Sequence, residues 1–402
     1  MNKIKTDLLD IFQTALSAVA GKQVVEKAIK REKYAGQFHV IAIGKAADAM
    51  VQGLSDENII DGLIISKHGH ISNQLQQDSR FSCIESDHPI PKNSSLLAGK
   101  ALLKYLQELP DNATCLFLIS GGASALVEVL HDGWSLADLT ELTDYLLANA
   151  YSISEINAVR RKVSKIKGGG LWYFLGDRSV SCLIISDVPN DKPIDIGSGL
   201  LFPDTISASA IPNLPNKWLS RLKASEPINT PKSFNWEIIA SLSNAKQAAA
   251  DHAIKLGYSV KVISDFIDGE AINVAKDCVE QIKNTPQKIF IWGGETTVIL
   301  PKKPGKGGRN QHLALAAAIQ MQDLTECYLL AAGTDGSDGL STATGALVDN
   351  KTVKKGYKRG LDASEHLQKA DANSFFEASD ELIITGATGT NVMDLVIAIQ
   401  LL

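Results

Sequence analysis

Short apolar runs alternate along the chain with longer segments whose apolar residues recur at helical spacing. The short runs, such as FHVIAI, CLFLI, CLIIS, KIFIW and CYLLAA, are rich in branched side chains and predict buried β-strands. Several lead into a glycine turn and then a helical pattern, as in residues 38–50, 113–130 and 288–320. Strands that alternate with helices in this way form parallel sheets. We therefore expect an α/β protein with two doubly wound, mostly parallel sheet domains.

Residues 1–22 superficially resemble a secretory signal peptide, but Asp7 and Asp10 interrupt the apolar part. The apolar residues recur at helical spacing, which predicts an amphipathic first helix instead. No apolar run approaches the length that a membrane-spanning helix needs. Farther along, residues 134–175 predict two or three helices, residues 237–258 a helix, residues 258–271 a strand, and residues 381–400 a strand, a glycine turn and a last helix.

With 402 residues the chain is too long for one ordinary hydrophobic core, so two domains are expected. Glycine and proline punctuate residues 196–231, which predicts a loop-rich connection and places the domain boundary there. The predicted domains are residues 1–232, a Rossmann-like domain, and residues 233–402, a second α/β domain. Whether the last helix packs back on the N-terminal domain is left open.

The composition is typical of a globular protein, with 45% hydrophobic and 21% charged residues. A net charge of −5 and an aromatic content of 6% argue against a nucleic-acid-binding face. The five cysteines stand alone, and three of them lie in apolar runs, which indicates buried, reduced thiols. We therefore expect a cytoplasmic protein that binds a small molecule, has no nucleic-acid or membrane partner, and is a monomer or a homodimer.

Three glycine turns with polar side chains are concentrated in residues 293–346. Glycines let a backbone approach phosphate closely, and helix N-termini offer unpaired N–H groups to anions. An arginine beside such a turn supplies a planar fork of donors, and carboxylates supply the oxygen ligands that Mg²⁺ takes. Together these features indicate phosphoryl transfer. The candidate nucleotide- or substrate-binding residues of this stretch are Gly293, Gly294, Glu295, Thr296, Gly308, Asn310, Gly333 and Thr334.

Arg309 is the strongest single candidate, because a lone arginine between glycines and Asn-Gln has few packing reasons to be there. Its guanidinium could stabilise charge on the phosphoryl oxygens, and the alternative is a salt bridge that orders the loop. Asp335 and Asp338 are spaced so that a turn could aim both carboxylates at one metal ion. Turn-forming Asp-Gly pairs explain the same residues without a metal, and Glu295 has the same ambiguity.

In the N-terminal half, Lys45 follows a strand and a glycine, where its ammonium could reach a phosphate. The spacing matches neither a P-loop nor the GxGxxG dinucleotide fingerprint, and a solvated lysine at a helix start is the alternative. The segment Ser120-Gly121-Gly122, with Ser124, offers N–H groups and hydroxyls to a carboxylate or a phosphate. A tight turn with a serine cap explains that segment equally well.

Asn157, Arg160 and Lys167 lie on or just after a basic helix, and such faces are usually solvated. Lys167 is the best candidate of the three, because the glycines that follow it permit close approach. Asp187 ends a predicted strand and Asp191 lies in the following loop. Either could be a Mg²⁺ ligand or the base that accepts a substrate hydroxyl proton, and turn capping is the alternative for Asp191.

Eight segments appear in the order typical of one enzyme family: GKAADAM, SGGASAL, NAVRRKVSKIKGGG, IISDVPND, GGETTV, GGRNQ, GTDGSDG and TGTNVMDL. The chain resembles the glycerate 2-kinases that carry a MOFRL-type C-terminal domain, some of which have been labelled hydroxypyruvate reductases. The resemblance covers nearly the whole chain. It implies two α/β domains with the active site in the cleft between them, and transfer of the γ-phosphoryl group of ATP to D-glycerate with Mg²⁺. It also implies catalytic roles for Lys45, Arg309 and Asp187, and a binding role for Asn391.

Several positions depart from the family pattern. Ala123 stands where a third glycine is usual, His312 stands in place of Glu, and Leu340-Ser341-Thr342 replaces Pro-Thr-Asp. Asn190-Asp191 replaces Gly-Asp, and Leu200 follows Ser198-Gly199 in place of proline. These departures keep open a close small hydroxy acid as the substrate. The alternatives are a hydroxypyruvate reductase-type oxidoreductase, for which no GxGxxG follows a strand, and a catalytically weak ligand-binding relative.

Overall fold

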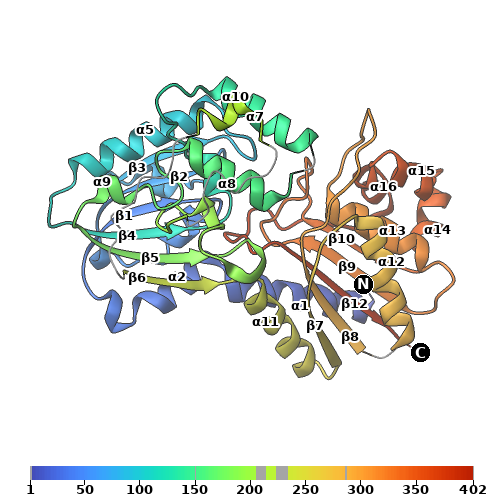
Figure 1. Cartoon of the computed structure of the whole chain (residues 1–402). Helices are drawn as coiled ribbons and strands as arrows, with labels where there is room; N and C mark the ends of the chain where they lie inside the picture. Colours follow the sequence, from blue (N-terminus) through green and yellow to red (C-terminus); the bar gives the residue numbers. More distant parts are fainter. Residues whose placement is uncertain (1, 150, 205–213, 223–233, 286–287, 402) are drawn as a thin grey trace. The chain divides into compact units, whose positions relative to one another are not determined.

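A computed structural model of the chain describes residues 2–149, 151–204, 214–222, 234–285 and 288–401. The chain forms two compact units, one of residues 21–239 and one that combines residues 1–20 with residues 240–402 (Figure 1). The boundary predicted at 232/233 lies outside the described residues. The first helix was predicted in the N-terminal domain, but it belongs to the unit of residues 240–402.

The N-terminal unit is built on a six-stranded sheet within the described residues, in the order β3-β2-β1-β4-β5-β6. The pairs β1–β2, β2–β3, β1–β4 and β4–β5 are parallel, which confirms the prediction for this sheet. β6 was predicted as the start of a helix; it is a strand because it adds to the edge of the sheet beside β5. The strands are β1 Phe38–Ile43, β2 Ile59–Lys67, β3 Phe81–Ser86, β4 Thr114–Ile119, β5 Ser179–Ile185 and β6 Asn235–Ala240.

Helices cover this sheet, and α5 and α9 bury Leu102, Leu106 and Trp172 against Phe117 and Ile184. A smaller apolar cluster joins α7, α8 and α10, where Trp218 stacks on Trp134 at a centroid distance of 5.9 Å. The helices of this unit are α2 Gly21–Ile29, α3 Ala47–Val51, α4 Asn73–Gln77, α5 Asn93–Glu108, α6 Ala123–Leu126, α7 Leu136–Ala148, α8 Ile153–Val163, α9 Trp172–Leu175 and α10 Asn216–Leu219, with short 3₁₀ turns η1 Glu32–Tyr34, η2 Asp56–Asn58, η3 Pro189–Asp191 and η4 Ile196–Ser198.

The C-terminal unit has a second six-stranded sheet among its described residues, in the order β11-β10-β9-β12-β8-β7. β7 and β8 pair in parallel, whereas β12 pairs antiparallel with β8 and with β9, and β10 pairs antiparallel with β9 and β11. Most strands therefore point one way, as predicted, but β10 and β12 run against them and make the sheet mixed. The strands are β7 Ser259–Ile267, β8 Lys288–Gly294, β9 Cys327–Gly333, β10 Gly345–Asp349, β11 Leu382–Ile383 and β12 Asp394–Gln400.

The prediction of a last helix at the end of residues 381–400 was wrong, because the segment DLVIAIQ forms β12. Every residue of β12 except Gln400 is buried, so the segment carries no polar face that would reveal its period. A short continuous apolar run fits a buried strand or a buried helix equally well. The segment is a strand because it lies between β8 and β9 and pairs with the backbone groups of both. A helix there would leave those buried groups without hydrogen-bond partners.

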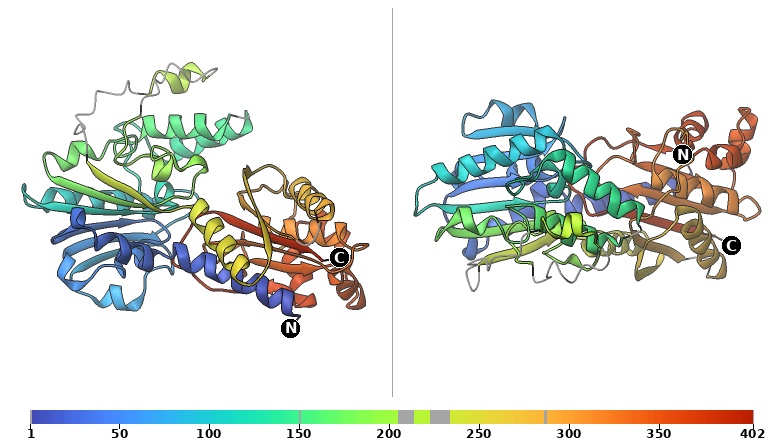
Figure 2. Two further views of the ribbon diagram at one scale, coloured as in Figure 1. Left: turned by 90° about the horizontal axis from the view of Figure 1, so that it is seen from below. Right: turned by 45° about the horizontal axis from the view of Figure 1, so that its top comes forward.

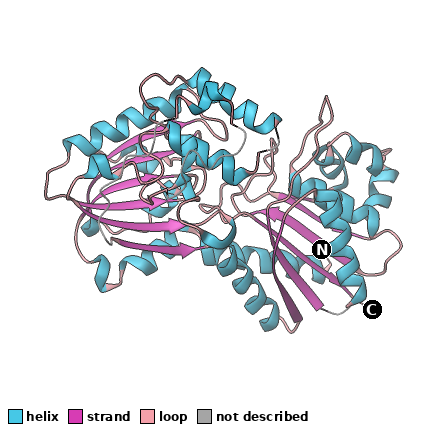
Figure 3. Ribbon diagram, in the orientation of Figure 1, coloured by secondary structure: helices cyan, strands magenta, loops and turns pink. Residues whose placement is uncertain are grey.

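Helices cover both faces of this sheet (Figures 2 and 3). α1 and α11 pack together on one face, whereas α12 and α13 bury Val274 and Leu313 against Trp292 and Val396 on the other. The helices are α1 Lys3–Val19, α11 Leu242–Lys255, α12 Ala271–Asn284, α13 Arg309–Gln320, α14 Thr352–Lys358, α15 Ala363–Gln368 and α16 Ala372–Ser379. None of the helices in the described ranges combines the length and apolarity that crossing a membrane would require.

The cysteine prediction is confirmed, since Cys115, Cys182 and Cys327 are buried free thiols. Cys278 is also buried, and Cys83 is half-buried. Burial raises the pKa of the Cys327 and Cys278 thiols to about 12, so these side chains stay protonated at neutral pH.

Phe12→Ala should destabilise the C-terminal unit by about 3–5 kcal/mol, because Phe12 lies fully buried on the face of α1 that packs in that unit. Hydrogen exchange should become faster in α11 and β12 and stay unchanged in β1–β5. Gln13→Ala, an exposed neighbour on the same helix, is the control. Faster exchange confined to β1–β5 would contradict the assignment of α1 to this unit.

Candidate functional site

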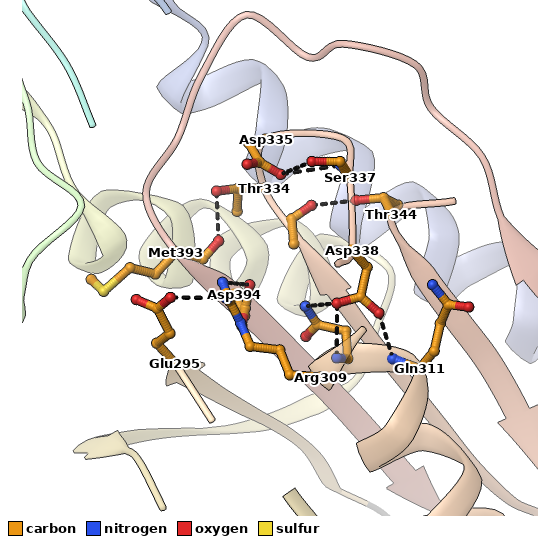
Figure 4. A network of polar contacts seen from close by, with 12 residues as sticks. Glu295, Arg309, Gln311, Thr334, Asp335, Ser337, Asp338, Thr344, Met393 and Asp394 are labelled. Atoms are coloured by element: carbon orange, nitrogen blue, oxygen red, sulfur yellow. Dashed lines mark hydrogen bonds and ion pairs between the residues drawn. The ribbon is translucent and has the colours of Figure 1, made fainter. Parts of the chain in front are cut away.

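The ends of three neighbouring strands meet at one edge of the C-terminal sheet. β8 and β9 end there with Gly294 and Gly333, and antiparallel β12 begins there with Asp394. The register places Asp394 beside both glycines. The loops that follow β8 and β9 therefore bring the predicted turns of residues 293–297 and 333–339 to the same edge, together with the start of α13 (Figure 4).

Arg309 is the first residue of α13, and two carboxylates hold its guanidinium (Figure 4). Its Nε donates to Asp394 Oδ2 at 2.5 Å, and a terminal nitrogen donates to Asp394 Oδ1 at 3.1 Å. Its other terminal nitrogen lies 2.8 Å from Glu295 Oε1. The Asp394 side chain is 4% exposed, whereas Glu295 is 47% and Arg309 36% exposed. Burial opposes the charge of Arg309, but the Asp394 carboxylate outweighs it and raises the pKa of the guanidinium.

Asp338 is buried and caps the first turn of α13. Its Oδ1 accepts the Asn310 backbone N–H at 3.1 Å, and its Oδ2 accepts that of Gln311 at 2.8 Å. Gly308 makes this approach possible, because a Cβ there would lie 2.3 Å from Asp338 Oδ1. Burial raises the pKa of Asp338 to about 6, although the backbone hydrogen bonds act in the opposite direction.

The turn after β9 is fixed by its own polar groups. Thr334 Oγ1 donates to the Met393 carbonyl at 2.6 Å and accepts the Val392 N–H at 2.8 Å. Asp335 Oδ1 accepts from the Ser337 N–H at 3.0 Å, which closes a local turn. Gly336 has a φ of +89° and lies against the carbonyl of Gly386, so no other residue fits there. Asp335 and Asp338, predicted to face one metal ion, thus engage different partners.

The remaining predicted residues of this unit line the same edge. Gly293 and Gly294 end β8, where a Cβ would clash with Leu242 and with the Ile267 carbonyl. Thr296, Asn310 and Asn391 are buried. Sequence reasoning missed Asp394, because the helix predicted at the end of residues 381–400 gave this acidic residue no place at the sheet edge.

In the N-terminal unit, the turn after β4 packs against the turn after β1. The Lys45 N–H donates to the Gly121 carbonyl at 2.9 Å, and the Ala46 N–H donates to Ser120 Oγ at 3.0 Å. Gly44 has a φ of +136°, and a Cβ there would overlap Ser120 Oγ. A Cβ on Gly122 would lie 3.0 Å from the His88 ring and 3.3 Å from Lys45 Cγ, so both side chains flank this glycine.

Arg160 extends the same turn, since one of its guanidinium nitrogens donates to the Ser124 carbonyl at 3.2 Å. Ser124 Oγ lies 2.7 Å from the hydroxyl of Ser198, a buried residue with a φ of +59°. Burial lowers the pKa of Arg160, although nearby Glu128 favours the charged form. The structure therefore brings Lys45, the serine-glycine turn and Arg160 together within this unit.

Lys167 was the best basic-helix candidate for a ligand contact, but the structure pairs it with Glu128 in the interior. Both side chains are completely inaccessible to solvent. Burial lowers the pKa of Lys167 to about 8, although the Glu128 carboxylate favours the ammonium. No local pattern reveals this pair, because 39 residues separate its members.

Asp187 lies just beyond the carboxyl end of β5, as predicted, and is half-buried. Asp191 lies in the 3₁₀ turn η3, where both Asn190 and Asp191 have a positive φ. Asn157 is a half-buried residue of α8. On the same helix the buried Arg161 Nε pairs with Asp204 Oδ2 at 3.0 Å, an ion pair that sequence reasoning did not find.

Two family models match the chain, and together they span most of it. Residues 7–228 match the model described as "Domain of unknown function (DUF4147)", and residues 288–394 match the MOFRL family. The first match lies mostly in the N-terminal unit, and the second lies entirely in the C-terminal unit.

Relatives with assigned names align over nearly their full length. A glycerate 2-kinase of Pyrococcus horikoshii is 34% identical over 97% of this chain and 93% of that protein. A D-glycerate 2-kinase of Thermotoga maritima is 32% identical over 98% of each. A putative hydroxypyruvate reductase of Agrobacterium vitis is 33% identical over 90% of this chain and 98% of that protein. The crystal structure of a Thermotoga maritima glycerate kinase matches over 100% of both chains with a TM-score of 0.86 and 30% identity.

Asp338 should make stability depend on pH. Its pKa rises from the ordinary 3.8 to about 6 on folding, so the folded state holds a proton that the unfolded state releases between these values. The contribution of Asp338 therefore falls as pH rises from about 4 to about 7, by roughly 3 kcal/mol. Urea unfolding of wild type and Asp338→Asn should be compared across this range. The unfolding free energy of wild type, relative to that of the variant, should fall as pH rises. A difference that stays constant with pH would contradict the raised pKa.

Lys167→Met should cost about 3–5 kcal/mol of unfolding free energy, because it leaves the Glu128 carboxylate buried without a cation. Adding Glu128→Leu should recover most of that loss. Lys165→Met, which removes a pair with the exposed Asp132, should cost no more than about 1 kcal/mol. A Lys167→Met protein that unfolds like wild type but no longer binds substrate would show that Lys167 is a ligand residue instead.

Proposed function

Because this chain belongs to the glycerate 2-kinase family, we propose that it transfers the γ-phosphoryl group of ATP to D-glycerate and releases 2-phosphoglycerate and ADP. The observation that carries the proposal is the similarity to two named glycerate 2-kinases over almost the whole of each chain. The arrangement of cations supports it, since Arg309 and Lys45 each lie at a glycine turn beyond a strand end. Such turns suit phosphate, because N–H groups and a cation converge there.

In the proposed reaction, the 2-hydroxyl of glycerate attacks the γ-phosphorus. A new O–P bond forms, the bond from the γ-phosphorus to the bridging oxygen breaks, and ADP leaves with that oxygen. Asp187 accepts the proton that the hydroxyl loses. Arg309 and Lys45 neutralise charge on the phosphoryl oxygens, and the segment Ser120–Ser124 with Arg160 binds the glycerate carboxylate.

Mg²⁺ fits this chain as a partner of ATP and not as an ion in a protein cage. The described residues contain no group of three or more His, Cys, Asp or Glu side chains that could hold a metal. Mg²⁺ usually takes only one or two carboxylates and completes its shell with phosphate oxygens and water. Asp187 and Asp191 of the N-terminal unit and Asp335 of the C-terminal unit are each proposed as a candidate for one of these one or two positions. Asp338 already uses both oxygens to cap α13. Bound there, Mg²⁺ would neutralise phosphate charge.

Hydroxypyruvate reduction is the second candidate, because a similar protein of Agrobacterium vitis carries that name. The reaction requires a nicotinamide cofactor, and the GxGxxG turn that binds such cofactors is absent after each strand of the sequence. We therefore favour the kinase. We further propose that the protein works in the cytoplasm, where its free cysteines stay reduced, as a monomer or a homodimer.

ADP release from Mg-ATP, measured with and without D-glycerate, tests the kinase proposal. We expect glycerate-dependent turnover of about 1–100 s⁻¹, and Lys45→Ala and Arg309→Ala should each lower it at least about 100-fold. Oxidation of NADH or NADPH by hydroxypyruvate, without glycerate-dependent ADP, would favour the reductase instead. Wild-type turnover in both alanine variants, with cooperative unfolding retained, would disprove the assigned roles.

A further inference from the structure

We propose that Asp394 is the positioning residue of Arg309, and that Glu295 is an exchangeable partner that gives up the guanidinium to a phosphate. The inference rests on the proposed function, because it names the residues that prepare Arg309 for an anionic ligand. Asp394 would touch neither substrate nor nucleotide and would act only through the arginine.

The two carboxylates hold Arg309 differently. Asp394 receives two hydrogen bonds, from Nε and from one terminal nitrogen, which fixes the plane of the guanidinium. Glu295 lies against the other terminal nitrogen. The bidentate partner, Asp394, is buried, whereas Glu295 is about half exposed. The buried carboxylate therefore sets where the guanidinium lies.

The surroundings of Asp394 leave its carboxylate little freedom. Its neighbours across the sheet are Gly294 and Gly333, which lack side chains that could compete for its oxygens. A Cβ on Gly333 would lie 2.9 Å from the Ser337 carbonyl oxygen and 3.4 Å from Asp394 Oδ1, so a larger residue there would crowd the turn beside the ion pair. β12 is paired with both β8 and β9 at Asp394, which holds the backbone of this residue in place.

Glu295 occupies the position that a phosphoryl oxygen would need. Its carboxylate supplies a negatively charged oxygen 2.8 Å from the guanidinium, which is the contact that a bound phosphate makes with arginine. An ion pair at an exposed carboxylate is weak, because water competes for both partners. A polyphosphate carries more charge and can displace Glu295, whereas the buried contact with Asp394 persists.

The experiment compares Asp394→Asn, Glu295→Gln and a matched control, Glu381→Gln. Glu381 is a buried carboxylate of the same unit that pairs with Lys5 and Lys355, so its loss tests mere destabilisation. We expect Asp394→Asn to lower kcat about 100-fold, since small misplacements of a transition-state contact cost that much. Glu381→Gln should lower the melting temperature and leave kcat within about twofold of wild type. Glu295→Gln should lower the KM for ATP.

A double-mutant cycle shows whether Asp394 acts through Arg309. In an Arg309→Ala background, Asp394→Asn should reduce kcat no more than about twofold further. A further reduction in kcat as large as the one that Asp394→Asn causes in wild type would overturn the inference. If Asp394→Asn does not fold, Asp394→Glu keeps the charge and shifts the guanidinium. We expect it to lower kcat more than about tenfold, and an unchanged kcat would overturn the inference.

Binding of β,γ-imido-ATP separates this inference from the proposed function. Calorimetry with Mg²⁺ should show about tenfold weaker binding to Asp394→Asn and tighter binding to Glu295→Gln than to wild type. A wild-type protein that binds the analogue but phosphorylates no glycerate would disprove the proposed function and leave this test in force. Equal binding by wild type and Asp394→Asn, or weaker binding by Glu295→Gln, would overturn the inference.

Discussion

The ion pair between the buried Asp394 and Arg309 links strand order to chemistry in the C-terminal unit. Asp394 is buried at the sheet edge, where an unpaired charge would be costly. Arg309 satisfies it with two hydrogen bonds. The pair exists only because β12 runs antiparallel between β8 and β9, which places its first residue where those strands end. A parallel β12 would begin at the opposite edge, far from α13.

Asp338 and Asp394 position Arg309 in different ways: Asp338 fixes the backbone of its helix, and Asp394 fixes its side chain. Asp338 accepts the N–H groups of Asn310 and Gln311 and so fixes the first turn of α13 from which Arg309 extends. Asp394 then fixes the guanidinium. Each carboxylate thus serves one function. Asp338 is poorly suited to a metal, because a carboxylate that accepts backbone N–H groups on both oxygens has little capacity left for a cation.

Local pattern was enough for much of this fold and for part of the site. The glycine turns after β1, β4, β8 and β9 were found because each follows an apolar run. Arg309 was found because it stands alone at a predicted helix start. Features that depend on distant pairing were missed: β12 shows no period of its own, and Asp394 and Glu128 acquire their meaning only from Arg309 and Lys167. Electrostatic pairing across the fold leaves no trace in local spacing.

Two departures from the family pattern, Ala123 and His312, bear on packing more than on ligand contact. Ala123 is fully buried, and its methyl group lies against Gly197, whose missing side chain leaves room for it. His312 is buried on α13, where desolvation lowers its pKa and favours the neutral ring. Side chains that point into the core alter volume and internal hydrogen bonding, whereas a change of substrate requires different groups at the ligand. The exchange of Glu for His and of Gly for Ala is therefore compatible with the family's own substrate. The exposed departures Asn190, Leu340 and Thr342 are the ones that could present a new group to it.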